Sequence, residues 1–282
     1  MKLLVTGAAG MLGQRVVTDA TARDWDVVGI DLPDADLTDE HAAREVIARH
    51  APDAIVHCAA WTDVDGAEER EDAALKVNAD ASRYVARGAR HVDARVVAVS
   101  TDYVFDGSLT GRPYVESDPP APLGAYGRTK LAGELAIAAE LDDHAIARTA
   151  WLFGAGGKNF CETMLGLAAT RDRVAVVTDQ VGSPTWTGHL SPALLDLAAN
   201  DLRGPVHTAG GGQCSWHALT VELFTLAEVD CEVGETTAAE FQRPAPRPAW
   251  SVMATERSDE GAPVLPPWQD GVRGFIEERT AP

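Results

Sequence analysis

The sequence predicts an α/β fold, in which a doubly wound parallel sheet is joined to a smaller, interleaved C-terminal lobe. Two observations predict it. Short apolar runs alternate with amphipathic runs from residue 2 onwards, and this alternation breaks after about Phe153. Strand, helix and strand in regular succession imply right-handed crossovers and helices on both faces of a parallel sheet. The 282 residues exceed the usual size of one domain, so one large unit or two lobes are expected.

The predicted elements follow from the period of the apolar residues. Strands are predicted at residues 2–6, 26–30, 54–58, 95–100, 145–151 and 205–208, and helices at 11–22, 39–49, 72–91 and 126–141. Later, three prolines within residues 243–248 exclude a helix there. We therefore expect a dinucleotide-binding lobe from residues 1–153 plus about 184–209. The second lobe would comprise about 154–183 and 210–282.

The charge is strongly acidic and excludes several classes of function. Forty-three acidic residues against twenty-four basic ones give a net charge of −19, with no acidic tail that concentrates it. This predicts an acidic shell suited to a cytoplasm of high salt, where screening relieves self-repulsion; an ordinary acidic protein is the alternative. Without a basic stripe, nucleic acid is not an expected partner. No apolar run is long enough to span a membrane, and a strand starting at residue 2 leaves no room for a signal peptide.

The cysteines and His57 are predicted to be structural. Cys58, Cys161, Cys214 and Cys231 are scattered without metal-ligand spacing, which favours buried thiols over ligands or disulfides. His57 ends an apolar run, so packing at a strand end is favoured over metal binding. No metal site is predicted from these residues.

A glycine-rich turn follows the first predicted strand. It reads Gly7-Ala8-Ala9-Gly10-Met11-Leu12-Gly13 and opens the first helix. Gly7 allows a tight turn, Gly10 admits a pyrophosphate close to the backbone, and Gly13 lets the helix pack against the sheet. In this strand–turn–helix setting the pattern predicts a Rossmann-type site for NADH or NADPH. Met11 and Leu12 lie in the first helical turn beside the phosphates.

The next two strands supply further cofactor-binding candidates. Asp31 follows the second strand, where a carboxylate accepts hydrogen bonds from the adenosine ribose and repels a 2′-phosphate. This favours NAD over NADP. We expect Asp36 and Leu37 to flank the adenine. The small side chains of Ala59 and Ala60, after the third strand, let the dinucleotide pass.

Tyr126 and Lys130 lie four residues apart at the start of a predicted helix, so both side chains project from one face. An ammonium beside a phenol favours the phenolate, so we expect a lowered pKa for Tyr126. Thr101 follows the fourth strand and faces the same crevice. The three residues predict a ketone-reducing site, with Thr101 holding the carbonyl oxygen, Tyr126 as general acid, and Lys130 tuning Tyr126 and binding the nicotinamide ribose.

At this point the chain resembles the extended short-chain dehydrogenase/reductase family, and within it the dTDP-4-dehydrorhamnose reductases. The resemblance covers nearly the whole chain. It rests on residues 6–13 (TGAAGMLG), 59–65 (AAWTDVD), 100–105 (STDYVF), 126–134 (YGRTKLAGE), 148–154 (RTAWLFG), 158–160 (KNF), 179–185 (DQVGSPT) and 247–251 (RPAWS). The first and fourth of these belong to the wider superfamily, whereas STDYVF and DQVGSPT are more specific.

The resemblance implies the residues of the substrate site. Sugar contacts would fall on Thr62, Val64, Asp102, Tyr103 and Trp151, and the nucleotide end would meet Asn159, Gln180 and Arg247. Other readings stay open: the two aromatic side chains as packing residues, Thr62 and Asp63 as helix caps, and Arg243 and Arg247 as solvated surface. The resemblance also implies that Mg²⁺ and a homodimer are compatible with the chain, although no carboxylate set for the metal is found.

Three hypotheses for function follow. The first is reduction of the C4 ketone of dTDP-4-dehydrorhamnose to dTDP-L-rhamnose. The second is a binding role without turnover, as in the regulatory subunit of methionine adenosyltransferase, which has the same fold. The third is a reductase or epimerase for another nucleotide sugar. The intact set of Thr101, Tyr126 and Lys130 favours an enzyme.

Overall fold

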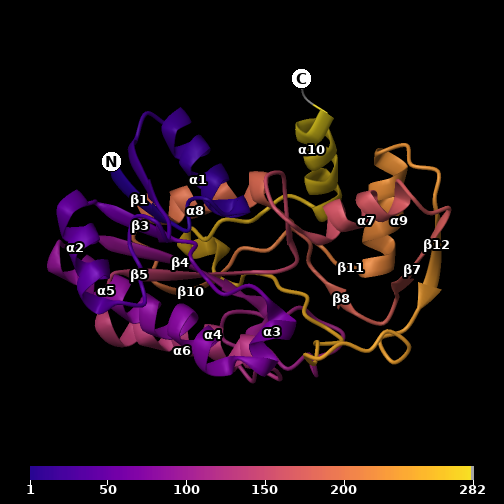
Figure 1. Cartoon of the computed structure of the whole chain (residues 1–282), viewed down its shortest axis with the longest axis horizontal. Helices are drawn as coiled ribbons and strands as arrows, with labels where there is room; N and C mark the ends of the chain where they lie inside the picture. The colour runs from indigo at the N-terminus through magenta and orange to yellow at the C-terminus, as the bar shows by residue number, and fades with distance from the viewer. Residues whose placement is uncertain (281–282) are drawn as a thin grey trace.

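A six-stranded parallel sheet forms the centre of the molecule in the computed structural model, which describes residues 1–280 (Figure 1). The strand order is β10-β5-β4-β3-β1-β2, and every neighbouring pair is parallel. The strands are β1 (Lys2–Thr6), β2 (Asp26–Ile30), β3 (Ala54–His57), β4 (Arg95–Thr101), β5 (His144–Thr149) and β10 (Gly204–His207). The predicted doubly wound fold is confirmed. The chain order reverses between β1 and β3, where such sheets bind ligands beyond the carboxyl ends of their strands.

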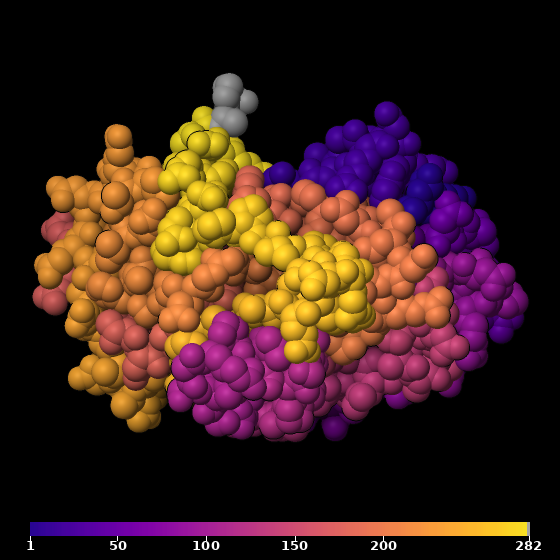
Figure 2. All heavy atoms as spheres, turned by 180° about the vertical axis from the view of Figure 1, so that it is seen from behind, coloured from indigo at the N-terminus to yellow at the C-terminus, as the bar shows by residue number. Residues whose placement is uncertain are grey.

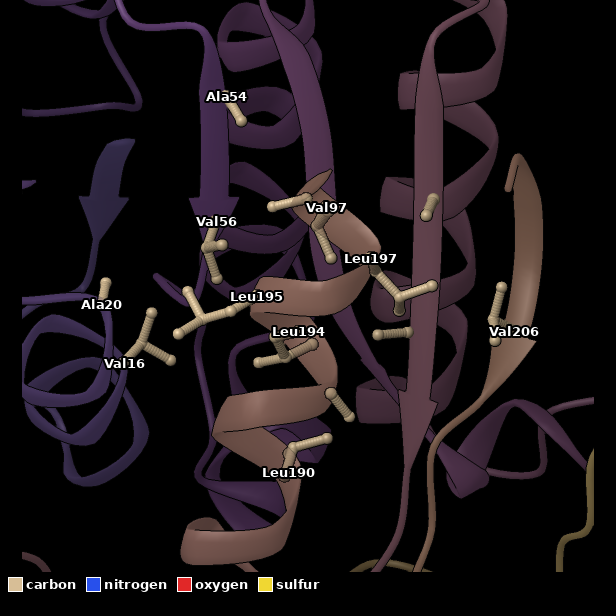
Figure 3. Close-up of a cluster of buried hydrophobic side chains, with 14 of the residues drawn as sticks. Val16, Ala20, Ala54, Val56, Val97, Leu190, Leu194, Leu195, Leu197 and Val206 are labelled. Atoms are coloured by element: carbon tan, nitrogen blue, oxygen red, sulfur yellow. The ribbon is translucent and has the colours of Figure 1, made fainter. Parts of the chain in front are cut away.

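Helices cover both faces of this sheet (Figure 1). One face carries α1 (Met11–Ala22) and α8 (Thr187–Ala199), and the other carries α2 (Glu40–His50), α5 (Ala81–His91) and α6 (Ala125–Glu140). Figure 3 shows side chains of α8, among them Leu194 and Leu197, gathered over the β-branched residues of the strands, such as Val56 and Val97. This burial fixes the sheet on which the site is built.

The predicted helix over residues 72–91 is broken into three parts, and this corrects the prediction. It begins as α4 (Glu71–Leu75), passes through a π-helical turn (Lys76–Asp80) and continues as α5. A short helix before it, α3 (Val64–Glu69), was not predicted. Its N-cap is Asp63, whose carboxylate accepts a hydrogen bond from Gly66 N at 2.9 Å. Of the two candidate caps, Asp63 is therefore the one used.

The second lobe lies to the right of the sheet in Figure 1 and has its own core. Its helices are α7 (Phe160–Ala168), α9 (Trp216–Leu226) and α10 (Trp268–Thr280). Its short strands pair two by two: β7 (Arg173–Val177) with β12 (Glu232–Thr236), and β8 (Val181–Gly182) with β11 (Cys214–Ser215). A further pair, β6 (Leu152–Phe153) and β9 (Thr185–Trp186), follows β5 and precedes α8. Two single 3₁₀ turns cover Asp102–Val104 and Ser258–Glu260.

The C-terminal part of the chain returns across the first lobe. Tyr114 N donates to Val252 O at 2.8 Å, and Ala254 N donates to Tyr114 O at 3.0 Å. From behind, Figure 2 shows the yellow C-terminal chain lying against the magenta segment that contains Tyr114. The chain therefore crosses between the lobes more than once.

The predictions for the thiols and His57 agree with the structure. All four cysteines are free, and three of them are buried. His57 is buried and hydrogen-bonded to Thr6 and Ser82. Among residues 1–280, no helix combines the length and apolar character needed to cross a bilayer.

Candidate active site

The glycine-rich turn after β1 forms a cradle that larger residues would fill. Gly7 has a φ of +66°, and a Cβ placed on it would lie 2.7 Å from Ala59 N. A Cβ on Gly13 would lie 2.1 Å from Gly7 O. Gly10 is the N-cap of α1, so the free amides of Met11 and Leu12 open toward this cradle. The turn fits a pyrophosphate against a helix N-terminus.

Three carboxylates lie where the adenosine end of such a cofactor would be held. Asp31 Oδ2 accepts a hydrogen bond from Ala9 N at 2.9 Å, which ties it to the glycine turn. Asp34 accepts a hydrogen bond from Asp31 N at 2.9 Å. Hydrogen bonds from the side chain and backbone of Thr38 lower the pKa of Asp36. Leu37 packs partly buried beside β2, and this end of the crevice is strongly negative.

The three predicted reacting groups come together at the carboxyl end of β4. Thr101 is the last residue of β4, and Tyr126 and Lys130 lie in the first turns of α6. The Thr101 hydroxyl lies near the Tyr126 phenol, whose pKa it lowers in opposition to burial. Lys130 is 9% exposed, and its ammonium donates to Val99 O at 2.8 Å. The site therefore combines a phenol, a small alcohol and an ammonium beside the glycine cradle.

The expectation of a lowered pKa for Tyr126 is wrong. Burial raises the pKa of this phenol above its ordinary value; the hydrogen bond from Thr101 opposes that shift only in part, and the charge of Asp102 adds to it. Lys130 directs its ammonium toward a β4 carbonyl, and burial lowers the pKa of Lys130 to about 8. Desolvation is the largest influence on both groups: it raises the pKa of the phenol and lowers that of the ammonium.

Two of the sugar-binding candidates, Tyr103 and Asp102, lie near Tyr126. The Tyr103 ring packs edge-to-face on the Tyr126 ring, with centroids 5.6 Å apart. Asp102 is 2% exposed, and burial raises its pKa to about 6 against opposing hydrogen bonds from Ser251 and Thr101. Thr62 is exposed in the loop before α3, and Val64 is the first residue of that helix.

The loop that carries Thr62 is held by a residue of the π-helical turn. The Asn78 side chain accepts from Trp61 N at 2.9 Å and donates to Thr129 Oγ1 at 3.0 Å, so it joins the loop to α6. Asn78 is 1% exposed. Asparagine is a poor helix former, which favours a polar role for Asn78 within a helical run, but the π-helical turn itself was not predicted.

Trp151 lies in a strained conformation between β5 and β6. Its φ is +47°, which a bulky residue rarely adopts. Its indole stacks on Trp216, the first residue of α9, with centroids 3.5 Å apart and an interplanar angle of 4°. A Cβ on Gly182 would lie 2.4 Å from the Trp151 ring, so the glycine of DQVGSPT makes room for the indole. Sequence analysis missed Trp216, because only the fold brings it to Trp151.

The three residues predicted at the nucleotide end come from three separate segments of the chain. Asn159 caps α7 and donates to Gly154 O at 2.8 Å, with a further contact to Met11 Sδ at 3.4 Å. It therefore shapes a loop beside the glycine turn. Gln180 is half-buried just before β8.

Arg247 is engaged by an acidic residue that sequence analysis did not identify. Asp65, in α3, accepts from Arg247 Nη1 at 3.0 Å and from Arg243 Nη2 at 2.7 Å. Ala245 N donates to Asp65 as well, at 3.1 Å. The reading as solvated surface is wrong for Arg247, whose side chain is 14% exposed, whereas Arg243 is ion-paired but remains 49% exposed. Nothing in the local sequence pairs residues 182 positions apart.

No group of three or more histidine, cysteine or acidic side chains with the arrangement of a metal site is found within residues 1–280.

Comparison with known proteins places this site in a defined family. Residues 1–281 match the family model described as the RmlD substrate binding domain. The chain is 44% identical to dTDP-4-dehydrorhamnose reductase of Streptomyces griseus, over 90% of this chain and 86% of the relative. It is 41% identical to a probable dTDP-4,6-dihydroxy-2-methyloxan-3-one 4-ketoreductase of Streptomyces antibioticus, over 97% and 94%. A crystal structure of dTDP-4-dehydrorhamnose reductase from Bacillus anthracis in complex with NADP is 34% identical, covers 98% of this chain and 99% of that chain, and superposes with a TM-score of 0.95.

Proposed function

The chain belongs to the RmlD substrate-binding-domain family, and from this we propose that it is an NAD(P)H-dependent oxidoreductase that reduces the C4 ketone of dTDP-4-dehydrorhamnose to dTDP-L-rhamnose. The resemblance seen in the sequence is thereby confirmed. One observation of the site carries the proposal: Thr101, Tyr126 and Lys130 lie together beside the glycine cradle at the carboxyl end of the sheet.

The chain's own residues would handle the proton of this reaction. We propose that the Thr101 hydroxyl holds the ketone oxygen and that the Tyr126 phenol gives its proton to that oxygen as C4 is reduced. A raised pKa suits this role, since the phenol is fully protonated near neutral pH. The alkoxide that forms is far more basic than a phenolate, so the transfer remains favourable. Lys130 would bind the nicotinamide ribose through the N–H groups that Val99 O does not occupy.

The glycine cradle favours a nicotinamide dinucleotide as the cofactor, which would supply the hydride when bound. Gly7, Gly10 and Gly13, with Met11 and Leu12, would hold its pyrophosphate, and Ala59 and Ala60 would flank its path. Asp31 would accept hydrogen bonds from the adenosine ribose, near Asp36 and Leu37. Because a 2′-phosphate would face the three carboxylates of this segment, we propose NADH as the preferred cofactor.

The substrate would bind between the lobes. We propose that residues 1–153 and about 184–209 carry the cofactor, and that about 154–183 and 210–282 hold the nucleotide sugar. Thr62, Val64, Asp102, Tyr103 and Trp151 would contact the sugar. Asn159, Gln180 and Arg247 would serve the nucleotide end, with Asp65 orienting the Arg247 guanidinium.

A related keto sugar is the second candidate substrate. The Streptomyces antibioticus relative is named for a different dTDP-linked ketone, and a relative from Streptomyces niveus, 45% identical over 80% of this chain, is named dTDP-4-keto-6-deoxy-D-glucose reductase. These names share the C4 ketone and differ in the configuration or in the hydroxyl groups of the hexose ring. The sugar pocket, and not the reacting groups, would distinguish them.

The direct test is turnover with each candidate ketone. Oxidation of NADH and NADPH is followed by absorbance after adding dTDP-4-dehydrorhamnose or dTDP-4-keto-6-deoxy-D-glucose, and the product is identified by NMR. The proposal expects dTDP-L-rhamnose as the product of the better substrate. Oxidation only with the second ketone would assign the second candidate, and no oxidation with either would refute the function.

We also propose that the enzyme works in a cytoplasm of high salt, because such a medium screens the repulsion within a protein whose net charge is −19. A homodimer is proposed from the family resemblance, and light scattering of the purified protein would test it.

A further inference from the structure

Glu134 is a buried carboxylate that the proposed mechanism leaves unused. It lies on α6 and is 7% exposed. Arg148 of β5 donates to it through Nη2 at 2.7 Å and through Nε at 3.1 Å. Ser100 of β4 donates to its Oε1 at 2.5 Å. Removing a carboxylate and an arginine from water is costly, so a buried pair of this kind is weak evidence for stability alone.

The position of Glu134 relative to Lys130 suggests another purpose. The two residues are four apart on α6, so their side chains lie on one face, one turn apart. Both line an internal cavity of about 10 Å³, whose other polar walls are His57, Asn78, Ser82 and Ser100. Lys130 donates one N–H to Val99 O, while Glu134 accepts hydrogen bonds from Ser100 and Arg148. The carboxylate therefore acts on Lys130 across the cavity rather than in a direct ion pair.

We propose that Glu134 is a positioning residue for the reaction, fixed by Arg148 and Ser100 so that its negative charge keeps Lys130 protonated under the reacting groups. The inference rests on the proposed function, because the charge of Lys130 has a role only in the proposed reaction. An uncharged lysine would lose one of its donors to the nicotinamide ribose and its influence on Tyr126.

Glu134 is the main source of negative charge near Lys130, because the other titratable groups around the ammonium are neutral. Burial lowers the pKa of Lys130 to about 8, and Glu134 is the largest opposing influence. Cys58, after β3, opposes burial as well, but burial raises the pKa of its thiol to about 12, so it stays neutral. His57 of β3 is held neutral, with a pKa near 3, by burial and by the Lys130 charge. Tyr126, on α6, is protonated.

Lysine NMR tests the proposal directly, because the chain has only four lysines: Lys2, Lys76, Lys130 and Lys158. The ¹³Cε resonance of each is followed against pH in protein labelled at lysine. In the Glu134→Gln variant we expect the titration midpoint of Lys130 to fall by about one pH unit or more, while the midpoints of the other three lysines stay unchanged. The alkaline limb of kcat should move down by the same amount, which lost packing alone would not cause.

Two further variants guard against structural artefacts. Glu134→Gln leaves the buried charge of Arg148 unpaired, which destabilises that variant. The double variant Glu134→Gln/Arg148→Met removes both buried charges and should still move the titration of Lys130 down, by less than the single variant, because the positive charge of Arg148 is lost as well. Glu116→Gln is the matched control: this carboxylate accepts bonds from His207 N and Glu256 N, on the β10 side of the sheet, and its loss should leave Lys130 unmoved.

An unchanged Lys130 titration in the folded double variant would overturn the inference. The proposed function would survive that result if the wild-type chain still turned over the keto sugar. Loss of turnover in the wild-type chain, with Lys130 shifted as expected in the variant, would instead count against the function and leave the inference standing.

Discussion

At the residue scale, burial raises the pKa of the Tyr126 phenol above its ordinary value of about 10, so the phenol is protonated at neutral pH with a wide margin. The sequence predicts that Tyr126, Lys130 and Thr101 meet, and the structure has Thr101 at the end of β4 and both other residues at the start of α6. It gave the wrong sign for the pKa of Tyr126. Desolvation depends on what the whole fold packs over a side chain, and that is absent from a local pattern.

Asp31 is the residue on which cofactor preference is expected to depend. Its carboxylate is fixed by Ala9 N and Leu32 N, so it cannot easily turn away from a 2′-phosphate. In Asp31→Asn we expect the ratio of kcat/KM for NADPH over NADH to rise about tenfold, or ~1.4 kcal/mol. Steady-state kinetics with both cofactors measures this ratio. Glu45→Gln, which removes an exposed carboxylate of α2, is the control, and an unchanged ratio in Asp31→Asn would exclude the role.

At the scale of elements, hydrogen bonds to Asp65 hold the segment 243–247 against α3. Partial burial opposes ionisation of Asp65, but the bonds from Arg247, Ala245 N and Arg243 prevail and hold its pKa at about 2. Because this pKa is below the ordinary aspartate value of about 3.9, the stabilisation is present above about pH 4 and is lost as pH falls through about 2.

Asp65→Asn should therefore lower the free energy of unfolding at pH 7 by about 2 kcal/mol at most. Urea unfolding at pH 7 measures this, and thermal melts at successively lower pH should show the difference from wild type narrowing below pH 4. Glu69→Gln, an exposed carboxyl of the same helix, should have little effect. A difference that stays constant with pH would mean that the Asp65 charge does not fasten the segment.

The elements differ in how far the sequence predicted them. The bounds of β1, β2 and α1 agree with the prediction, because each shows a clear apolar period ended by a turn. The π-helical turn Lys76–Asp80 was read as ordinary helix, since one inserted residue barely disturbs that period. The stacking of Trp151 on Trp216 and the bonds of Asp65 were not predictable, because they join segments far apart in the chain.

At the scale of the whole molecule, the net charge is −19 on 282 residues, so we expect the surface carboxylates to repel one another in dilute buffer. At about 1 M salt the Debye length falls to roughly 3 Å, so the repulsion between surface carboxylates is largely screened. Both Tm and turnover should rise from dilute buffer to molar KCl. A neutral osmolyte at matched osmolality separates screening from solvent exclusion, and a Tm that does not respond to KCl would refute salt adaptation.

The central claim is that Tyr126 is the proton donor to the C4 oxygen, and the turnover of Tyr126→Phe tests it most directly. The variant keeps the ring that packs against Tyr103 and loses only the hydroxyl. With dTDP-4-dehydrorhamnose and NADH, we expect kcat to fall by about 100-fold or more while KM and Tm stay close to those of wild type. A folded Tyr126→Phe enzyme that retained nearly full kcat would contradict the account.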